Sequence, residues 1–286
     1  MPIIQTEDLT YLYGVGTPFE KTALNHINLS IEEGEFVGVI GHTGSGKSTL
    51  LQHFNGLIKP SAGRVLIDGK DIWEKGANRQ ALRFSVGLVF QYPEYQIFEE
   101  TVYKDVAFGP RNMGLSEKEV DIRVREAATF SGVEDSWLEK SPFALSGGQK
   151  RRVAIAGVLA MRPKVLILDE PAAGLDPRGR DAILDRICDY QRTQGTTVLL
   201  VSHSMEDIAR IATRVLVMDK GSTAFYGDVS TVFSHAKELL SMGLDVPQIT
   251  RVFMRLHEMG LPVQPSIYTV EQGKNEILRV LKERET

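Results

Sequence analysis

A glycine-rich loop between a short apolar strand and a helix is the feature that most constrains how this chain can fold. The loop reads Gly41-His42-Thr43-Gly44-Ser45-Gly46-Lys47-Ser48 and follows the apolar residues 36–40. Residues 48–54 continue as a helix, because their apolar side chains recur on one helical face. In this setting the glycines let backbone N–H groups point at a phosphate, and the helix N-terminus favours the same negative charge. The sequence therefore predicts a phosphate-binding loop in an α/β fold.

Two further motifs follow the loop. The run Leu145-Ser146-Gly147-Gly148-Gln149 opens a predicted helix, and the apolar strand 165–168 ends in Asp169 and Glu170. In open α/β sheets, ligands bind at the edge where strands end. We expect Asp169 to hold Mg²⁺ through water, the Ser48 hydroxyl to ligate it, and Glu170 to polarise an attacking water. Each motif alone could be an ordinary turn, and their order in the chain gives them weight.

Together these motifs resemble the set found in ATP-binding cassette (ABC) ATPases, whose signature the run 145–149 matches letter for letter. The resemblance implies that the signature faces the nucleotide of a partner subunit, so that ATP lies between one chain's phosphate loop and the other's signature. It also implies roles for Gln91 as the Q-loop glutamine, Asp176 in the D-loop and His203 as the switch histidine. Tyr13 resembles the aromatic residue that stacks on adenine, with Tyr11 as the alternative.

The expected ligands are thus ATP and Mg²⁺. The candidate catalytic residues are Glu170, His203 and Gln91, and the candidate Mg²⁺ ligands are Ser48, Gln91 and Asp169. The candidate ATP-binding residues are Tyr13, Gly41, Thr43, Gly44, Ser45, Gly46, Lys47, Ser48, Thr49, Ser146, Gly147, Gly148, Gln149 and Asp176.

Within the ABC ATPases, the stretches 14–20, 91–102, 105–112 and 168–177 resemble energy-coupling factor (ECF) transporter ATPases, specifically the second of their two ATPases. These transporters import vitamins and transition-metal ions. The resemblance implies three partners: a second ATPase, with a related chain favoured over a copy; an ECF-type transmembrane subunit; and a substrate-binding membrane subunit. Segment 92–101 would line the groove for the partner's coupling helices, although its aromatic residues could instead serve internal packing. Ala172 departs from the Thr or Ser of many ABC proteins and leaves the expected contacts in place.

The predicted fold is α/β: a P-loop ABC ATPase domain over residues 1–227, with a mixed sheet of antiparallel N-terminal strands and a parallel core. A helical insert is expected at about 92–162, and a helical extension at 228–286, which contacts a dimer partner or caps its own domain. One extension helix follows Pro247, and a Thr269–Gln272 capping box opens the last. The apolar faces of the two helices are predicted to be Ile249, Val252, Phe253 and Leu256, and Ile277, Val280 and Leu281.

Charge and hydropathy limit the partners. The chain carries 33 Lys and Arg against 37 Asp and Glu, so no basic excess favours nucleic acid. Neither a secretory signal nor a run of about 18 apolar residues is visible, so any membrane role must come through a partner. The ECF resemblance implies that this partner holds the chain, as a peripheral protein, on the cytoplasmic face of the membrane. Cys188 is expected to pack in a helix, and Lys150–Arg152 to form a solvated helix face. The alternatives are an ABC ATPase acting on ribosomes or nucleic acid, and a regulatory subunit without hydrolysis, against which Glu170 and His203 argue.

Overall fold

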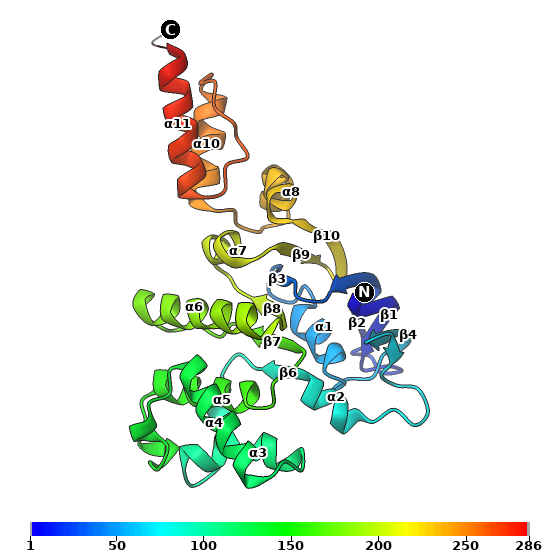
Figure 1. Ribbon diagram of the computed structural model, residues 1–286. Helices are drawn as coiled ribbons and strands as arrows, with labels where there is room; N and C mark the ends of the chain where they lie inside the picture. Colours follow the sequence, from blue (N-terminus) through cyan, green and yellow to red (C-terminus); the bar gives the residue numbers. More distant parts are fainter. Residues whose placement is uncertain (1, 285–286) are drawn as a thin grey trace. The chain divides into compact units, whose positions relative to one another are not determined.

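The computed structural model describes residues Pro2–Arg284 and divides into two compact units. The first unit comprises residues 1–35 and 48–201, and the second comprises residues 36–47 and 202–286. Figure 1 shows their elements coloured along the chain. Among the described residues, no helix combines the length and the apolar character needed to cross a membrane.

An antiparallel sheet occupies the N-terminal part of the first unit. Its strand order is β2 (Lys21–Glu32), β1 (Pro2–Tyr13), β4 (Ala62–Ile67) and β5 (Lys70–Asp71). Along β2 the side chains of Leu24, Ile27, Leu29 and Ile31 are buried, as the sequence alternation predicts. Asp68 and Gly69 form a turn after β4, both at positive φ, and the turn leads into β5 and then α2 (Arg79–Ser85), neither of which the sequence pattern predicts. A two-residue strand is too short to show a period.

Three parallel strands form the other sheet segment of the first unit, in the order β6 (Val86–Val89), β7 (Val165–Asp169), β8 (Thr197–Val201). Their side chains are almost all buried, which explains why these strands read as continuous apolar runs. The first unit also contains the helices α1 (Lys47–Phe54), apart from its first residue, and α6 (Pro177–Gln194). Cys188 is buried on α6 beside Ile187 and Leu184, in the packing role expected.

The segment between β6 and β7 is helical, as predicted. It contains η1 (Pro93–Gln96), α3 (Val102–Asn112), α4 (Glu117–Ser131), η2 (Asp135–Trp137), η3 (Pro142–Ala144) and α5 (Gly147–Leu159). Helices α3, α4 and α5 pack on one another, in green in Figure 1. A capping box of Ser116 and Glu119, typical of the Ser-x-x-Glu pattern, opens α4. These helices place the signature run at the N-terminus of α5.

The second unit begins with β3 (Phe36–Ile40), which runs parallel to β9 (Arg214–Asp219). Strand β10 (Ser222–Asp228) pairs antiparallel with β9, and the sequence analysis did not identify it. Helix α7 (Met205–Ile211) lies so close to β3 that a Cβ on Gly38 would approach the Ile208 side chain to 2.7 Å. Strand β3 leads directly into the phosphate loop.

The C-terminal extension contains α8 (Val229–Ser234), α9 (Ala236–Ser241), α10 (Gln248–Glu258) and α11 (Val270–Arg284). Helices α10 and α11, orange and red in Figure 1, lie side by side over a small core of Phe253, Val263, Ile267 and Val280. Ile249 and Leu256 pack against this core as predicted. The predicted capping box of Thr269 and Gln272 opens α11.

Three residues of the predicted apolar faces of α10 and α11 lie outside this core. Val252, Ile277 and Leu281 are 50%, 45% and 52% exposed. Successive helical residues are about 100° apart, so Val252 lies about 100° from the buried Phe253, and Leu281 equally far from Val280. The contact between α10 and α11 buries only part of the apolar face of each helix. Apolar residues at the edge of each face lie outside the core.

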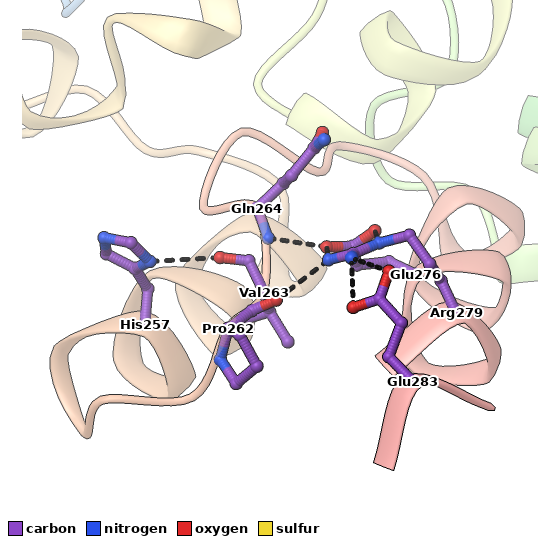
Figure 2. A network of polar contacts seen from close by, with 7 residues as sticks. All are labelled: His257, Pro262, Val263, Gln264, Glu276, Arg279 and Glu283. Atoms are coloured by element: carbon purple, nitrogen blue, oxygen red, sulfur yellow. Dashed lines mark hydrogen bonds and ion pairs between the residues drawn. The ribbon is translucent and has the colours of Figure 1, made fainter. Parts of the chain in front are cut away.

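A polar network joins α11 to the connection that follows α10 (Figure 2). The Arg279 guanidinium donates to Glu276 at 2.7 Å, to Glu283 at 2.8 Å and to the Pro262 carbonyl at 2.8 Å. Glu276 also accepts the Gln264 N–H at 2.7 Å. The network therefore fixes the connection between the two helices to one face of α11.

Candidate nucleotide-binding and hydrolysis site

In the second unit, the lysine of the phosphate loop hydrogen-bonds to the backbone of the same loop. The Lys47 ammonium donates to the Gly41 carbonyl at 2.6 Å and to the His42 carbonyl at 3.1 Å. Lys47 is only 9% exposed, so these acceptors compensate a buried charge. The same ammonium is chemically suited to take phosphate oxygens in place of the carbonyls.

The loop backbone depends on glycine at two positions. Gly44 and Gly46 have φ values of 81° and 102°, which residues with a Cβ rarely adopt. The Ser45 hydroxyl is buried and lacks a hydrogen-bond partner within the described part of the chain. An unpaired buried polar group is costly, so this hydroxyl lowers the stability of the loop.

In the first unit, two candidate Mg²⁺ ligands lie together. The Ser48 hydroxyl donates to the Asp169 carboxylate at 2.8 Å, across 121 positions of the sequence. Mg²⁺ prefers oxygen ligands and usually takes only one or two from the protein, with water and phosphate completing the shell. Residues 2–284 contain no cluster of three or more His, Cys, Asp or Glu suited to a metal. The Ser48–Asp169 pair therefore fits Mg²⁺ bound together with a nucleotide.

Glu170 and Gln91, the next pair in the first unit, are also in contact. The Gln91 amide donates to the Glu170 carboxylate at 3.2 Å. Strand β7 ends at Asp169, and Glu170 adopts a φ of 52°, a left-handed conformation that costs roughly 1–2 kcal/mol for a residue with a Cβ. A hydrogen bond from the Glu170 N–H to the Val201 carbonyl, 3.1 Å long, holds this conformation. Backbone strain of this kind concentrates at active sites, where it directs a side chain away from the line of its strand.

The two tyrosines proposed for adenine stacking differ in their surroundings. Tyr11 packs edge-to-face against both Tyr13 and His53, with ring centroids 4.8 and 4.9 Å apart. Tyr13 is 42% exposed, and its hydroxyl lies 3.2 Å from the Thr49 hydroxyl, another candidate site residue. Because Tyr11 is already bracketed by two rings, the arrangement favours Tyr13 as the ring that receives a base.

The signature run forms the start of α5. Ser146 is the N-cap, and its hydroxyl and the Gln149 side chain form a reciprocal capping box. A Cβ on Gly147 would meet nothing within 4 Å, and one on Gly148 would meet only the Leu175 side chain, at 3.5 Å. Packing within this chain therefore does not demand glycine at 147. A close approach by another molecule would demand it.

Asp176 and His203 are the remaining candidates. Asp176 is the N-cap of α6 and accepts the Gly179 N–H at 2.6 Å. His203, in the second unit, is exposed and immediately precedes Ser204, the N-cap of α7. The structure thus joins Ser48 to Asp169 and Gln91 to Glu170, and it leaves Asp176 and His203 as predicted site residues.

The expectation that Lys150–Arg152 forms a solvated face is wrong at Arg151. This side chain is buried, lies 3.2 Å from Glu94 of η1 and donates to the Ala173 carbonyl. A buried guanidinium needs such partners, and they connect α5 with η1 and with the segment after Glu170. The charge run itself carries no signal for this burial, because Arg151 finds its partners 57 and 22 positions away.

Comparison with known proteins identifies the family. Residues 24–173, more than half of the 286-residue chain, match the family model described as ABC transporter. The energy-coupling factor transporter ATP-binding protein EcfA2 of Clostridium tetani is 54% identical over 284 residues, covering 99% of each chain. The protein of the same description from Clostridium acetobutylicum is 56% identical over 283 residues, again covering 99% of each. This chain belongs to the ECF branch of the ABC transporter ATPases.

Solved structures agree with this membership. The structure described as cbiO1 from Clostridium perfringens, part of the ABC transporter complex cbiONQ, is 42% identical with a TM-score of 0.75, covering 91% of this chain and 97% of that one. The ATP-binding cassette MJ0796, a dimer bound to ADP and phosphate, is 29% identical with a TM-score of 0.71, covering 79% and 98%. The ECF membership confirms the predicted ABC ATPase fold and the expected activity class, ATP hydrolysis coupled to transport.

Proposed function

We propose that this chain is the ATP-hydrolysing subunit of an ECF-type importer and powers uptake of vitamins or transition-metal ions through membrane partners. The observation that carries the proposal is the Gln91–Glu170 contact beside a strained Glu170 backbone, in a chain related over its full length to ECF ATPases. The chain works on the cytoplasmic face of the membrane, where ATP is available, and reaches the membrane through its partners.

In this proposal the loop and strand-end residues divide the chemistry. Lys47 binds the β- and γ-phosphates, and Ser48 and Asp169 hold Mg²⁺, which neutralises phosphate charge when bound. Glu170 polarises the water whose oxygen attacks the γ-phosphorus, while the bond to the ADP oxygen breaks. Gln91 orients Glu170 through the 3.2 Å hydrogen bond, and His203 contacts the γ-phosphate.

The second ATPase completes the nucleotide site. We infer that this chain's Ser146–Gln149 run meets the ATP held by the phosphate loop of a related chain, and that the related chain's signature run meets the ATP held by this chain's phosphate loop. A Cβ on Gly147 would meet nothing within 4 Å in this chain, which supports a close approach of the partner's ATP to Gly147. The α5 N-terminus adds backbone N–H groups suited to an anion.

An exposed aromatic surface of the helical insert is the proposed docking site for the transmembrane subunit. Tyr92, Tyr95 and Phe98 are 53%, 84% and 59% exposed, while Ile97 of the same segment is buried. Next to them a cavity of about 240 Å³ is lined mostly by α3 and α5, including Phe108, which packs edge-to-face on Phe98. Clustered exposed aromatic side chains mark interaction surfaces, because their burial by a partner is favourable.

The proposal is tested by affinity purification of this chain from gently solubilised membranes, with identification of every copurifying protein. We expect a related ATPase, a polytopic membrane protein and small membrane companions whose solute is then measurable. A parallel purification of a variant with Tyr95→Ala and Phe98→Ala should lose the membrane proteins. Recovery of ribosomes or nucleic acid without membrane proteins would replace the importer with the non-transport alternative.

A further inference from the structure

The turn between β9 and β10 contacts the phosphate loop at three points, all within the second unit. The His42 Nε2 atom lies 2.9 Å from the Asp219 carboxylate, across 177 positions of the sequence. The Gly221 N–H donates to the Ser45 carbonyl at 3.0 Å. A Cβ on Gly41 would lie 2.5 Å from the Met218 carbonyl oxygen, so the two backbones touch. The turn is therefore packed against the loop along its length.

The contacting turn is conformationally restricted. Asp219 pairs with Ser222, so only Lys220 and Gly221 connect the two strands. Both have positive φ, 46° and 80°, as in the tight turns whose twist matches that of a hairpin. Since the turn is fixed by the β9–β10 pairing, Asp219 is presented to the loop from a rigid support.

The His42 imidazole lies between two hydrogen-bond acceptors. Its Nδ1 atom lies 2.9 Å from the Thr43 carbonyl, which can only accept, and Nε2 faces a carboxylate, which also only accepts when ionised. Each bond forms when the ring nitrogen concerned carries a proton, so the imidazole can donate to either acceptor. The imidazole thus links the loop backbone to the β9 carboxylate.

We propose that Asp219 and His42 form a clasp that holds the phosphate loop ready for the triphosphate of ATP, with both acting as positioning residues. The inference rests on the proposed ATPase function and adds a determinant outside the nucleotide motifs. The clasp acts on the residues that Lys47 binds, because the lysine holds the carbonyls of Gly41 and His42. If the loop is already ordered, ATP binding loses less conformational entropy of the loop. The affinity for ATP is then higher.

The test compares His42→Ala, Asp219→Ala and the double variant in the full chain by titration calorimetry with ATP and Mg²⁺. Each single change should weaken ATP binding about tenfold, or about 1.4 kcal/mol. The double variant should also lose about tenfold, since the two residues form one interaction. Asp219→Asn, which keeps an acceptor oxygen but no charge, should restore part of the affinity. The KM for ATP should rise while kcat stays within about twofold.

The matched control is Asp228→Ala, at the other end of the same strand pair, where Asp228 faces Arg214 at 3.3 Å and does not touch the loop. It should leave ATP affinity unchanged. Additive losses of about a hundredfold in the double variant, or an equal loss with Asp228→Ala, would overturn the clasp.

Hydrogen exchange of the loop amides in the nucleotide-free chain separates this inference from the proposed function. Asp219→Ala should speed exchange at residues 43–47, and unchanged exchange would also overturn the clasp. A wild-type chain that binds no ATP would refute the proposed function, while the exchange measurement would still decide whether the clasp orders the loop.

Discussion

Glu170 is the central residue of the proposed hydrolysis, because its carboxylate polarises the attacking water. We predict that Glu170→Gln lowers the ATP turnover rate about a hundredfold or more, since an amide cannot accept a proton. ATP binding should persist, because the phosphate contacts of Lys47 are untouched. Phosphate release and calorimetry measure the two quantities. Glu33→Gln, in an exposed turn, is the control, and an unchanged rate in Glu170→Gln would refute the catalytic role.

Arg151 is the residue whose burial has the clearest consequence for stability. Replacing it with Met leaves Glu94 without its cation and the Ala173 carbonyl without its donor. Breaking a buried pair in this way costs about 3 kcal/mol. We expect Arg151→Met to lower the urea midpoint accordingly, whereas Arg125→Met, in the exposed pair with Asp121, should change it little. Equal effects of the two substitutions would contradict the structural role assigned to Arg151.

Among the elements, α11 depends on the network in Figure 2. The Arg279 guanidinium, together with the Gln264 N–H, lowers the pKa of Glu276 from its usual 4.5 to about 2. Because this pKa is depressed on folding, the stabilisation is present above about pH 4.5 and is lost as the pH falls toward 2.

We therefore predict that Glu276→Gln destabilises the extension at pH 7 and that its difference from the wild type shrinks at pH 3. Urea unfolding followed by proteolysis within α11, at both pH values, measures this. Glu258→Gln, in the exposed pair with Arg255, should have little effect at either pH. A constant difference between Glu276→Gln and wild type would show that the charge of Glu276 is not the stabilising feature.

Segment 92–101 is the element through which transport is proposed to be coupled to hydrolysis. We predict that Tyr95→Ala with Phe98→Ala abolishes solute uptake in the assembled transporter and leaves intact the basal ATPase rate of this chain paired with the related ATPase. Uptake into vesicles and phosphate release are the measurements. Ile122→Ala, at a 45% exposed position on α4, is the control. Equal loss of uptake and basal hydrolysis would assign these aromatic residues to internal packing.

At the scale of the whole molecule, function is proposed to require a second ATPase. We predict that ATP, but not ADP, drives association of this chain with its related partner when both carry the hydrolysis-blocking change, here Glu170→Gln. Gly147→Val should prevent association and leave the fold intact, because the space around Gly147 is open within this chain. Analytical ultracentrifugation reports both, and association of the Gly147→Val chain at wild-type strength would contradict the proposed role of the signature.

The sequence by itself determined the features that depend on neighbouring residues. The glycines at 44 and 46, the capping box of Thr269 and Gln272, and the strand ending at Asp169 can be predicted from the sequence, because their causes lie within a few positions. The local patterns predicted a phosphate-binding loop in an α/β fold, and the resemblance of the ordered motifs to ABC ATPases implied the ABC ATPase fold that the comparisons confirm.

Only the tertiary structure decided which distant residues meet. Gln91 contacts Glu170 across 79 positions of the sequence, and His42 contacts Asp219 across 177 positions. No periodic pattern in the sequence predicts contacts at such separations. Burial is decided in the same way: Arg151 lies inside although its neighbours are charged, and Val252 lies outside although it is apolar. The physical reason is that packing and charge pairing act between elements, whereas the readable patterns arise within them.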